Sequence, residues 1–329
     1  MSINTKIGVV VQGPLVSRGR TGATANIGIQ ELKEKDIVDF DCINNISNMY
    51  SKYKDDFDNF ICVTWDTEDV TKLVTKIGKE AILSISDTTK IIKQNKKTII
   101  SDNTKYKQFF STLKGMEYLQ KKGCTYAIKI RTDQSLDLSK MKFHLLKVLD
   151  KVENDKRFIF PLINLNSPDL LEDFYFGAKT ENIINLCKIF LEKPEIYHSV
   201  HSDLFYKCAW LLNNKDKWPP DISYTPSGKY SKDQRLVILS TWSKYLDTFT
   251  NEIFQNLVWR GEKFPKKLLK NYIFNDVYPN EFSDLISNSL KKQSYNKIFN
   301  KAKKFYYKLV EIIPFSLKEF LKRLINRAI

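Results

Sequence analysis

An apolar run that stops abruptly at charged residues is the feature that most constrains the fold of this chain. The run Tyr126-Ala127-Ile128-Lys129-Ile130 has the pattern of a buried strand, and Arg131-Thr132-Asp133-Gln134 follow it directly. A strand of this kind places one carboxylate, that of Asp133, at the carboxyl edge of a sheet. Open α/β sheets bind nucleotides, sugars and metals at that edge. We therefore expect an α/β fold with a cleft beside Asp133.

A second apolar run predicts another strand with a polar end. Ile7-Gly8-Val9-Val10-Val11 precede Gln12-Gly13-Pro14, where glycine and proline force the chain to turn. Residues 17–25, which are rich in Gly, Arg, Ser and Thr, are expected to form a mobile loop. Further strands are expected over 59–65, 81–85, 157–163 and 173–177, with helices over 42–53, 103–121 and 180–191. Strands that alternate with helices indicate a mostly parallel sheet.

Composition excludes several other classes of protein. The five cysteines include no CxxC pair and the three histidines form no HExxH motif, which argues against a zinc ribbon, a disulfide framework and a zinc protease. No stretch reaches the roughly 18 apolar residues that a membrane-spanning helix needs. The polar start of the chain is not typical of a signal peptide. We expect a cytoplasmic protein, either free or bound to a membrane surface.

The positive charge of the chain is concentrated near its C-terminal end. Residues 285–329 contain eleven Lys or Arg and two Glu, a net charge of +9 out of +15 for the whole chain. After Pro314, apolar residues share one helical face: Leu317, Phe320, Leu321, Leu324, Ile325 and Ala328. This basic amphipathic pattern favours an anionic partner, namely the inner face of the plasma membrane. The alternative is a terminal helix that packs on the rest of the protein. No nucleic-acid-binding motif accompanies the charge.

The simplest division of the chain is a catalytic domain over 1–260 and a basic helical extension over 261–329. One reaction suited to a cleft at the sheet edge is transfer of a sugar from a nucleotide donor. This reaction needs contacts for the nucleoside, a cation or basic group for the leaving diphosphate, and a group that aims the acceptor hydroxyl.

Two aspartates are the candidates for this chemistry. Asp133 could bind Mg²⁺, Mn²⁺ or ribose while Arg131 faces phosphate, because hard cations prefer carboxylate oxygens. The alternative is a local pair between Arg131 and Asp133. Asp173 could orient the donor sugar or act as the base, or it could be a solvated loop carboxylate near Glu172.

Polar and aromatic residues at the other predicted strand ends and helix starts are candidates for donor binding. Gln12, Gly13 and Pro14 could lie against the nucleotide or form a plain tight turn. Trp65 could stack on a base or belong to the core. Asn103 and Gln108 could open a helix beside the cleft or act only as capping and surface residues.

In their order along the chain, these landmarks resemble the WavE family of lipopolysaccharide-synthesis proteins. The resemblance rests on Gln12-Gly13-Pro14-Leu15, Thr64-Trp65, Asn103 with Ser111-Thr112 and Gly115, Lys129 to Gln134, and Asp173 to Gly177. It covers roughly residues 5–200. The chain departs from the family in having Val63 before Thr64-Trp65, and in lacking a Trp beside Asp173.

The resemblance implies a GT-A-like, Rossmann-related fold and a glycosyltransferase that acts on a growing bacterial surface glycan such as lipopolysaccharide, lipooligosaccharide or capsule. It implies donor contacts at Gln12, Gly13, Arg131 and Asp133, and an acid facing the sugar at Asp173. Enzymes of this fold usually show two carboxylates where Arg131-Thr132-Asp133 supplies one, so a divalent cation stays an open question. The alternatives are a polyol-phosphate or nucleotidyl transferase and a non-catalytic scaffold of glycan assembly.

Overall fold

The computed structural model describes most of the first 265 residues and a short strand beyond them. The described residues are 5–25, 31, 33–86, 91–94, 97–100, 104–149, 157–164, 169–192, 200–212, 238, 241–242, 245–265 and 272–273. All of them belong to one compact unit, Met1–Pro279. A second unit, Asn280–Ile329, lies outside the described residues, as does the basic helix expected there. The predicted boundary at residue 260 therefore stays a prediction.

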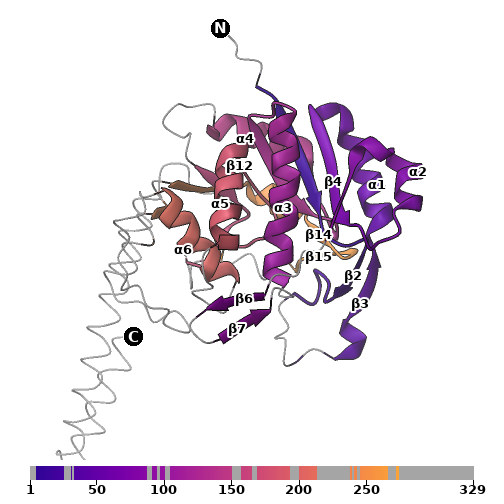
Figure 1. Ribbon diagram of the computed structural model, residues 1–329, viewed down its shortest axis with the longest axis horizontal. Helices are drawn as coiled ribbons and strands as arrows, with labels where there is room; N and C mark the ends of the chain where they lie inside the picture. The colour runs from indigo at the N-terminus through magenta and orange to yellow at the C-terminus, as the bar shows by residue number, and fades with distance from the viewer. Residues whose placement is uncertain are drawn as a thin grey trace, which may run out of the picture. The chain divides into compact units, whose positions relative to one another are not determined.

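Among the residues that the structure describes, the main sheet has seven strands and is flanked by helices (Figure 1). Its strands are β1 (Ile7–Gln12), β4 (Asn59–Trp65), β5 (Ile82–Ile85), β8 (Tyr126–Arg131), β10 (Phe158–Phe160), β12 (Phe176–Lys179) and β13 (Leu246–Thr248). The helices are α1 (Cys42–Tyr53), α2 (Thr71–Ile77), α3 (Thr104–Lys121), α4 (Leu138–Leu149), α5 (Thr180–Glu192), α6 (Val200–Leu212) and α8 (Asn251–Gln255). Short strands are β2 (Val16–Gly19), β3 (Val38–Asp41), β6 (Ile91–Gln94), β7 (Lys97–Ile100), β9 (Gln134–Ser135), β11 (Ile163–Asn164), β14 (Val258–Trp259), β15 (Glu262–Lys263) and β16 (Tyr272–Ile273).

The order of the strands across the main sheet is β13-β10-β12-β8-β1-β4-β5. The pairs β8–β1, β1–β4, β4–β5 and β10–β13 are parallel, whereas β12 runs antiparallel to both of its neighbours, β8 and β10. The chain is thus a mostly parallel α/β protein with a Rossmann-like sheet flanked by helices, as predicted. The sheet binds a ligand most readily where the strand order reverses direction, beside β1.

The register of the central strands brings the predicted strand ends together. Gln12, the last residue of β1, is paired with Arg131 at the end of β8 and with Val63 near the end of β4. Because these three strands are parallel, the turns that follow them emerge at the same edge of the sheet. The N–H of Gly13 donates to the carbonyl oxygen of Val63 (3.1 Å), which ties the turn after β1 to β4.

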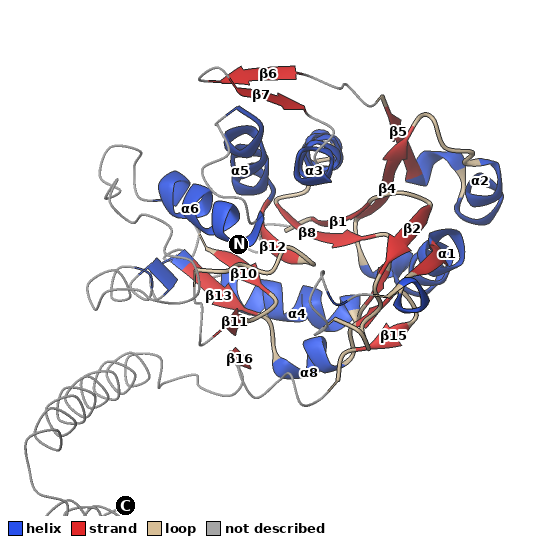
Figure 2. Ribbon diagram, turned by 90° about the horizontal axis from the view of Figure 1, so that it is seen from below, coloured by secondary structure: helices blue, strands red, loops and turns tan. Residues whose placement is uncertain are grey.

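Helices cover both faces of the sheet, with α3, α5 and α6 on one side and α1, α4 and α8 on the other (Figure 2). Helix α3 lies very close to the central strands because each side of the contact has a glycine, Gly115 on α3 and Gly8 on β1. A Cβ atom at Gly115 would lie 2.6 Å from Val10 Cγ1, and one at Gly8 would lie 2.6 Å from Leu119 Cδ1. This close contact fixes the distance between α3 and the sheet, and with it the positions of the polar side chains of α3 at the sheet edge.

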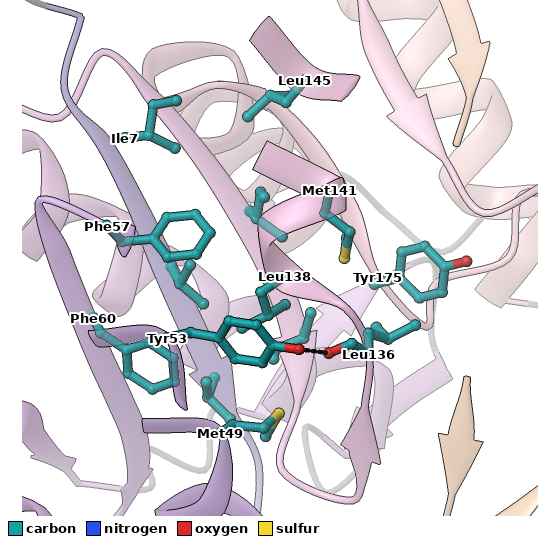
Figure 3. Close-up of a cluster of buried hydrophobic side chains, with 14 of the residues drawn as sticks. Ile7, Met49, Tyr53, Phe57, Phe60, Leu136, Leu138, Met141, Leu145 and Tyr175 are labelled. Atoms are coloured by element: carbon teal, nitrogen blue, oxygen red, sulfur yellow. Dashed lines mark hydrogen bonds between the residues drawn. The ribbon is translucent and has the colours of Figure 1, made fainter. Parts of the chain in front are cut away.

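The core between the sheet and the α1–α4 side is apolar and closely packed (Figure 3). Its members include Ile7 of β1, Met49 and Tyr53 of α1, and Met141 of α4, all buried. The hydroxyl group of Tyr53 donates to the carbonyl oxygen of Leu136 (3.1 Å), so its one polar atom is satisfied. Burial of apolar surface on this scale is the main stabilising contribution to such a fold.

Two local predictions were wrong. Residues 17–25 do not form only a loop, because Val16–Gly19 pairs as strand β2 with β3, whose residues lie 19 to 25 positions later in the chain. The predicted strand over 173–177 begins only at Phe176, and Asp173 lies in the segment before it. In both cases a long-range partner decides where the strand begins or ends, and local periodicity does not contain that information.

Candidate functional site

A pocket of about 280 Å³ lies at the carboxyl ends of β1, β4 and β8. It is lined by Gln12, Gly13, Pro14, Ser17, Arg18, Trp65, Lys107, Gln108, Arg131, Thr132, Asp133 and Arg260. Six of the seven residues predicted to bind a donor are therefore together at one place. The seventh, Asn103, lies outside the described residues. Asp173 is not part of the pocket lining.

The turn after β1 forms one wall of the pocket. Gln12 is buried, and its side-chain oxygen accepts a hydrogen bond from the hydroxyl group of Ser111 on α3 (2.7 Å). Gly13 has a φ of 139°, and a Cβ atom there would lie 2.6 Å from Thr132 Oγ1. Thr132 Oγ1 in turn donates to the carbonyl oxygen of Pro14 (2.8 Å). Only glycine allows the backbone of the two turns to approach this closely.

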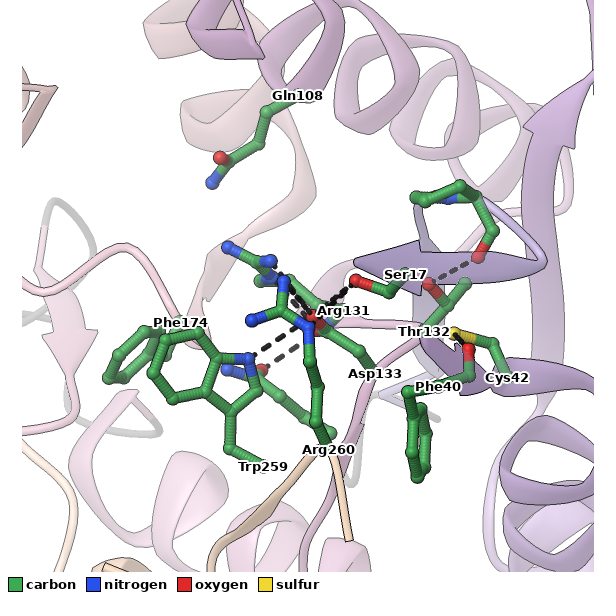
Figure 4. A network of polar contacts seen from close by, with 12 residues as sticks. Ser17, Phe40, Cys42, Gln108, Arg131, Thr132, Asp133, Phe174, Trp259 and Arg260 are labelled. Atoms are coloured by element: carbon green, nitrogen blue, oxygen red, sulfur yellow. Dashed lines mark hydrogen bonds and ion pairs between the residues drawn. The ribbon is translucent and has the colours of Figure 1, made fainter. Parts of the chain in front are cut away.

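The carboxylate of Asp133 is the centre of a network of hydrogen bonds and ion pairs (Figure 4). Its Oδ1 accepts from Arg131 Nε (3.0 Å). Its Oδ2 accepts from Arg131 Nη2 (2.9 Å), Ser17 Oγ (2.9 Å) and Trp259 Nε1 (3.1 Å), and is 3.0 Å from Arg260 Nη2. Asp133 is only 2% exposed. A carboxylate offers about four lone-pair sites, so the contacts within the protein already fill the accepting capacity of Asp133.

Electrostatics keep Asp133 ionised. Burial by itself would raise the pKa of this carboxyl group, but the charges and hydrogen bonds of Arg131, the charge of Arg260 and the hydrogen bond from Ser17 lower the pKa to about 2. The pKa of Arg260 is lowered by burial, which Asp133 partly offsets. These groups therefore form a charged cluster that holds one negative and two positive charges near neutral pH.

Trp259 and Arg260 reach this cluster through a tight hairpin. Strand β14 pairs with β9, and the backbone N–H of Arg260 donates to the carbonyl oxygen of Asp133 (2.9 Å). Arg260 has a φ of 46° and Gly261 a φ of 84°, so two residues with positive φ connect β14 to β15. Such a turn normally carries Asn-Gly or Asp-Gly. An arginine held in this conformation is typical of a functional site.

The electrostatic character of the pocket is positive. Its lining includes four basic residues, Arg18, Lys107, Arg131 and Arg260, and one acidic residue, Asp133. Arg18 also pairs with Glu34 and Asp39, but all three side chains are more than half exposed, and exposed pairs of this kind contribute little. The pocket is therefore suited to an anion.

A second polar cluster adjoins the pocket on the other side of Gln108. Gln108 lines the pocket and donates from Nε2 to Asp173 Oδ2 (2.6 Å). His201 Nδ1 lies 3.7 Å from both Asp173 Oδ1 and Glu172 Oε2, and 2.9 Å from the carbonyl oxygen of Leu171. Asp173 is buried, so it is not the solvated carboxylate that the sequence left open as an alternative.

Lys129 of β8 holds the backbone of the segment that carries Asp173. It is fully buried on β8, and its Nζ donates to the carbonyl oxygens of Asp173 (2.5 Å) and Phe174 (3.4 Å). Burial lowers the pKa of Lys129 to about 7, although the charge of Asp173 acts in the opposite direction. The strand that carries Arg131 thus also holds the segment that carries Asp173.

The two carboxylates of this cluster differ in acidity. Burial raises the pKa of Glu172. Burial would also raise the pKa of Asp173, but the charges of His201, Lys129 and Arg131 and the hydrogen bond from Gln108 lower it. The pKa of His201 is raised by Glu172 and Asp173, against the effect of its own burial. Neighbouring acids whose pKa values are pushed apart are typical of acid–base chemistry.

Glu172, Asp173 and His201 could hold a metal ion, because each offers a ligand atom within 4.8 Å of the other two. The sequence had placed a metal at Asp133 instead. At Asp133 an incoming cation would meet two guanidinium groups, so the chemistry of its partners does not favour a metal there. At the second cluster, Nδ1 of His201 would have to release the carbonyl oxygen of Leu171 before it could bind a metal.

Sequence reasoning assigned no functional role to six residues of the two clusters: Ser17, Lys129, Glu172, His201, Trp259 and Arg260. Ser17 was assigned to a mobile loop, and Arg260 fell at the predicted domain boundary. The one local signal that could have indicated Arg260 is its position before Gly261 in a hairpin between short strands. No local signal identifies His201, which lies in the first turn of α6.

Comparison with known proteins identifies no family. No family model matches the chain, and no curated protein matches it. Among solved structures, the chain is similar to 4-diphosphocytidyl-2C-methyl-D-erythritol synthase from Anaerococcus prevotii, with 11% identity, a TM-score of 0.35, and coverage of 61% of this chain and 82% of that chain. It is also similar to mannose-1-phosphate geranyltransferase from Thermus thermophilus, with 7% identity, a TM-score of 0.29, and coverage of 62% and 68%. At these scores the likenesses carry no argument about function, and the resemblance to the WavE family stays a prediction.

Proposed function

We propose that this protein is a glycosyltransferase that moves a sugar from a nucleotide-sugar donor to a growing bacterial surface glycan. The observation that supports this most is a positively charged pocket at the carboxyl ends of the parallel strands, with a buried, ionised carboxylate directly beside it. A nucleoside diphosphate sugar has an anionic diphosphate and a reactive carbon next to it. The adjoining positions of the pocket and of Asp173 match that arrangement of charges.

Each part of the pocket has a role in this proposal. The nucleoside is bound by Gln12 and Trp65, at the ends of β1 and β4, and by Gly13 and Pro14 in the turn after β1. Arg131 and its neighbouring basic residues neutralise the diphosphate leaving group. Asp173 lies across Gln108, where it orients the sugar or the acceptor hydroxyl group. The lowered pKa of Asp173 keeps it ionised for this purpose.

A divalent cation would belong to the second cluster in this scheme. Glu172, Asp173 and His201 would hold Mg²⁺ or Mn²⁺, and the ion would supply positive charge for the leaving diphosphate. The two carboxylates are the donors that such ions prefer. The pocket arginines provide positive charge independently of that ion.

The acceptor in this proposal is a lipid-linked or soluble oligosaccharide at the inner face of the plasma membrane. The support comes from sequence, namely the net charge of +9 over residues 285–329. Among the helices that the structure describes, none has the length and apolar character needed to cross a bilayer. A basic extension that binds the membrane surface would bring the pocket to a membrane-bound acceptor.

The proposal is tested by donor binding and by analysis of the product. The full-length protein is screened with UDP, GDP, CMP and their sugars by thermal shift, and the best donor is then incubated with acceptor glycans. Asp173→Asn should retain donor binding but lower the transfer rate by about 10²-fold or more, because loss of a catalytic acid–base group has effects of this size. Glu181→Gln, an exposed change on α5 with the same loss of charge, is the matched control.

Two outcomes would contradict the proposed activity, and a third would contradict the role of Asp173. Absence of binding to every nucleotide and nucleotide sugar would favour a non-catalytic scaffold. A product joined through a phosphodiester, detected by mass spectrometry, would show a polyol-phosphate or nucleotidyl transferase instead of a glycosyltransferase. Full activity of Asp173→Asn would remove Asp173 from the site.

A further inference from the structure

We propose that Asp133 is a positioning residue for Arg131, and that the pocket binds the diphosphate of its ligand through guanidinium groups without a metal at Asp133. This inference rests on the proposed function for the identity of the ligand, and it concerns how the pocket recognises the phosphates. The ligand class is a nucleoside diphosphate or its sugar ester. The contacts of Asp133 differ from those of a metal ligand.

A metal-binding aspartate must present a lone pair to the ion. The carboxylate of Asp133 is 2% exposed and already accepts hydrogen bonds at both oxygens, four of them at Oδ2 if the ion pair with Arg260 is included. Two of its partners are guanidinium groups, which would repel a cation. Moving the two guanidinium groups away to admit a metal ion would leave their own charges unpaired in the interior, which is costly. The carboxylate therefore serves the arginines.

Arg131 is held in place with part of its donor capacity left over. It donates Nε and Nη2 to the two oxygens of Asp133, which is the bidentate geometry that fixes a guanidinium plane. The side chain is 24% exposed and lines the pocket. Among the described residues, no protein acceptor is bonded to Nη1, so its two N–H groups are available to a phosphate oxygen.

Arg260 is the second guanidinium group that pairs with Asp133. Its three nitrogens are all engaged, Nε with Ser17 Oγ (3.0 Å), Nη1 with the carbonyl oxygen of Arg20 (2.6 Å) and Nη2 with Asp133. It is 8% exposed and lies over the ring of Trp259, 4.8 Å from its centroid. Arg260 therefore contributes fixed positive charge, whereas Arg131 contributes the donors that face the ligand.

The first test uses inorganic pyrophosphate as the probe and the full-length protein. Isothermal titration calorimetry in EDTA should show pyrophosphate binding that weakens with added salt, because the contacts are ionic. Arg131→Met and Arg131→Lys should each weaken pyrophosphate binding by at least about tenfold. Methionine removes the charge, whereas lysine keeps the charge but lacks the paired N–H donors of a planar guanidinium group. Lys121→Met, an exposed change on α3 with the same loss of charge as Arg131→Met, is the control. Pyrophosphate binding that appears only with added Mn²⁺ or Mg²⁺ would overturn the inference.

The second test isolates the role of Asp133. Asp133→Asn removes a negative charge, so a simple charge argument predicts tighter pyrophosphate binding. If Asp133 acts by positioning Arg131, binding should instead weaken by about threefold or more, and this effect should vanish in the Arg131→Met background. Tighter pyrophosphate binding by Asp133→Asn, or an equal loss of affinity in both backgrounds, would show that Asp133 does not act by positioning Arg131. Thermal melting of each variant reports whether it is folded, and the EDTA measurement on the unaltered protein needs no variant.

The two proposals fail in different ways. A glycosidic product that forms only when a divalent cation is present, together with metal-dependent pyrophosphate binding, would leave the glycosyltransferase proposal intact and overturn this one. Metal-independent pyrophosphate binding that depends on Arg131, without binding of any nucleotide sugar, would support the anion site and remove the proposed function.

Discussion

At the scale of single residues, the chemistry of this protein depends on charges that are buried together with their partners. Asp133 stays ionised in the interior because Arg131, Arg260 and Ser17 offset the loss of water around it. A buried ion network of this kind does not necessarily stabilise the fold relative to an apolar core. Its effect is to hold the side chains at the edge of the pocket in one arrangement.

The lowered pKa of Asp133 predicts how stability depends on pH. Its folded-state pKa of about 2 lies below the ordinary value of 3.8, so its contribution is present above the ordinary value and is lost as the pH falls through about 2. The difference in unfolding free energy between the unaltered protein and Asp133→Asn should narrow by about 2 kcal/mol between roughly pH 5 and pH 2. Urea unfolding at several pH values measures this difference.

A control for this prediction is Asp55→Asn, which removes an exposed carboxylate. Asp55→Asn makes the same chemical change without touching the contacts of Asp133, so it reports what the substitution alone does to stability. A difference for Asp133→Asn that does not change with pH would mean that its ion pairs do not favour the ionised carboxylate.

At the scale of secondary-structure elements, the position of α3 decides the geometry of both polar clusters. This helix carries Ser111, which bonds to Gln12, and Gln108, which bonds to Asp173. The absence of side chains at Gly115 and Gly8 lets α3 lie directly on the central strands. A small change in the height of the helix would therefore be transmitted to the two clusters together.

We predict that Gly115→Ala destabilises the protein although alanine favours helices. The gain in helix propensity is about 1 kcal/mol. The new methyl group would lie 2.6 Å from Val10 Cγ1 and 2.9 Å from Val63 Cγ2, and both valines belong to central strands that cannot move away easily. Overpacking of this kind costs about 1–3 kcal/mol, so the net loss should be about 1 kcal/mol.

Thermal or urea unfolding checks this prediction, with Gln120→Ala at an exposed position of the same helix as the control. The control should leave stability nearly unchanged. Pyrophosphate affinity should decrease in Gly115→Ala, since α3 would be displaced from the sheet edge. A variant with raised stability and unaltered affinity would mean that the close approach of α3 has no role.

At the scale of the whole molecule, charge is distributed very unevenly along the chain. The tail over residues 285–329 accounts for +9 of the total charge of +15. A basic amphipathic segment of this kind is attracted to an anionic bilayer within about a Debye length of the surface. The proposed enzyme would thus be concentrated where lipid-linked acceptors are made.

Replacing Lys318, Lys322, Arg323 and Arg327 by Gln should weaken binding to anionic vesicles by at least about a hundredfold, since each basic residue near the surface contributes about 1 kcal/mol. Co-sedimentation of the full-length protein with such vesicles measures the change. Replacing the exposed Lys33, Lys35, Lys54 and Lys121 by Gln is the matched control, because it removes the same charge elsewhere. If both sets of changes weaken binding equally, the tail is not the membrane contact.

Much of the architecture is encoded in local patterns. The strands Ile7–Gln12, Asn59–Trp65 and Tyr126–Arg131 and the helix Cys42–Tyr53 were predicted within one residue at each end. Apolar runs and helical spacing are properties of consecutive residues, so these elements can be identified without knowledge of the fold. The parallel arrangement of the central strands then followed, and it indicated that Gln12 and Asp133 would meet.

The sequence by itself therefore determined the α/β class, the central strands and the sheet edge at which polar residues gather. Only the tertiary structure decided the partners of these residues. Asp133 is joined to Ser17 and Arg260, which are 116 and 127 positions away along the chain, and Asp173 is joined to Gln108 at a distance of 65 positions. The physical reason is that burial and ion pairing depend on neighbours in space, whereas periodicity records only neighbours in sequence.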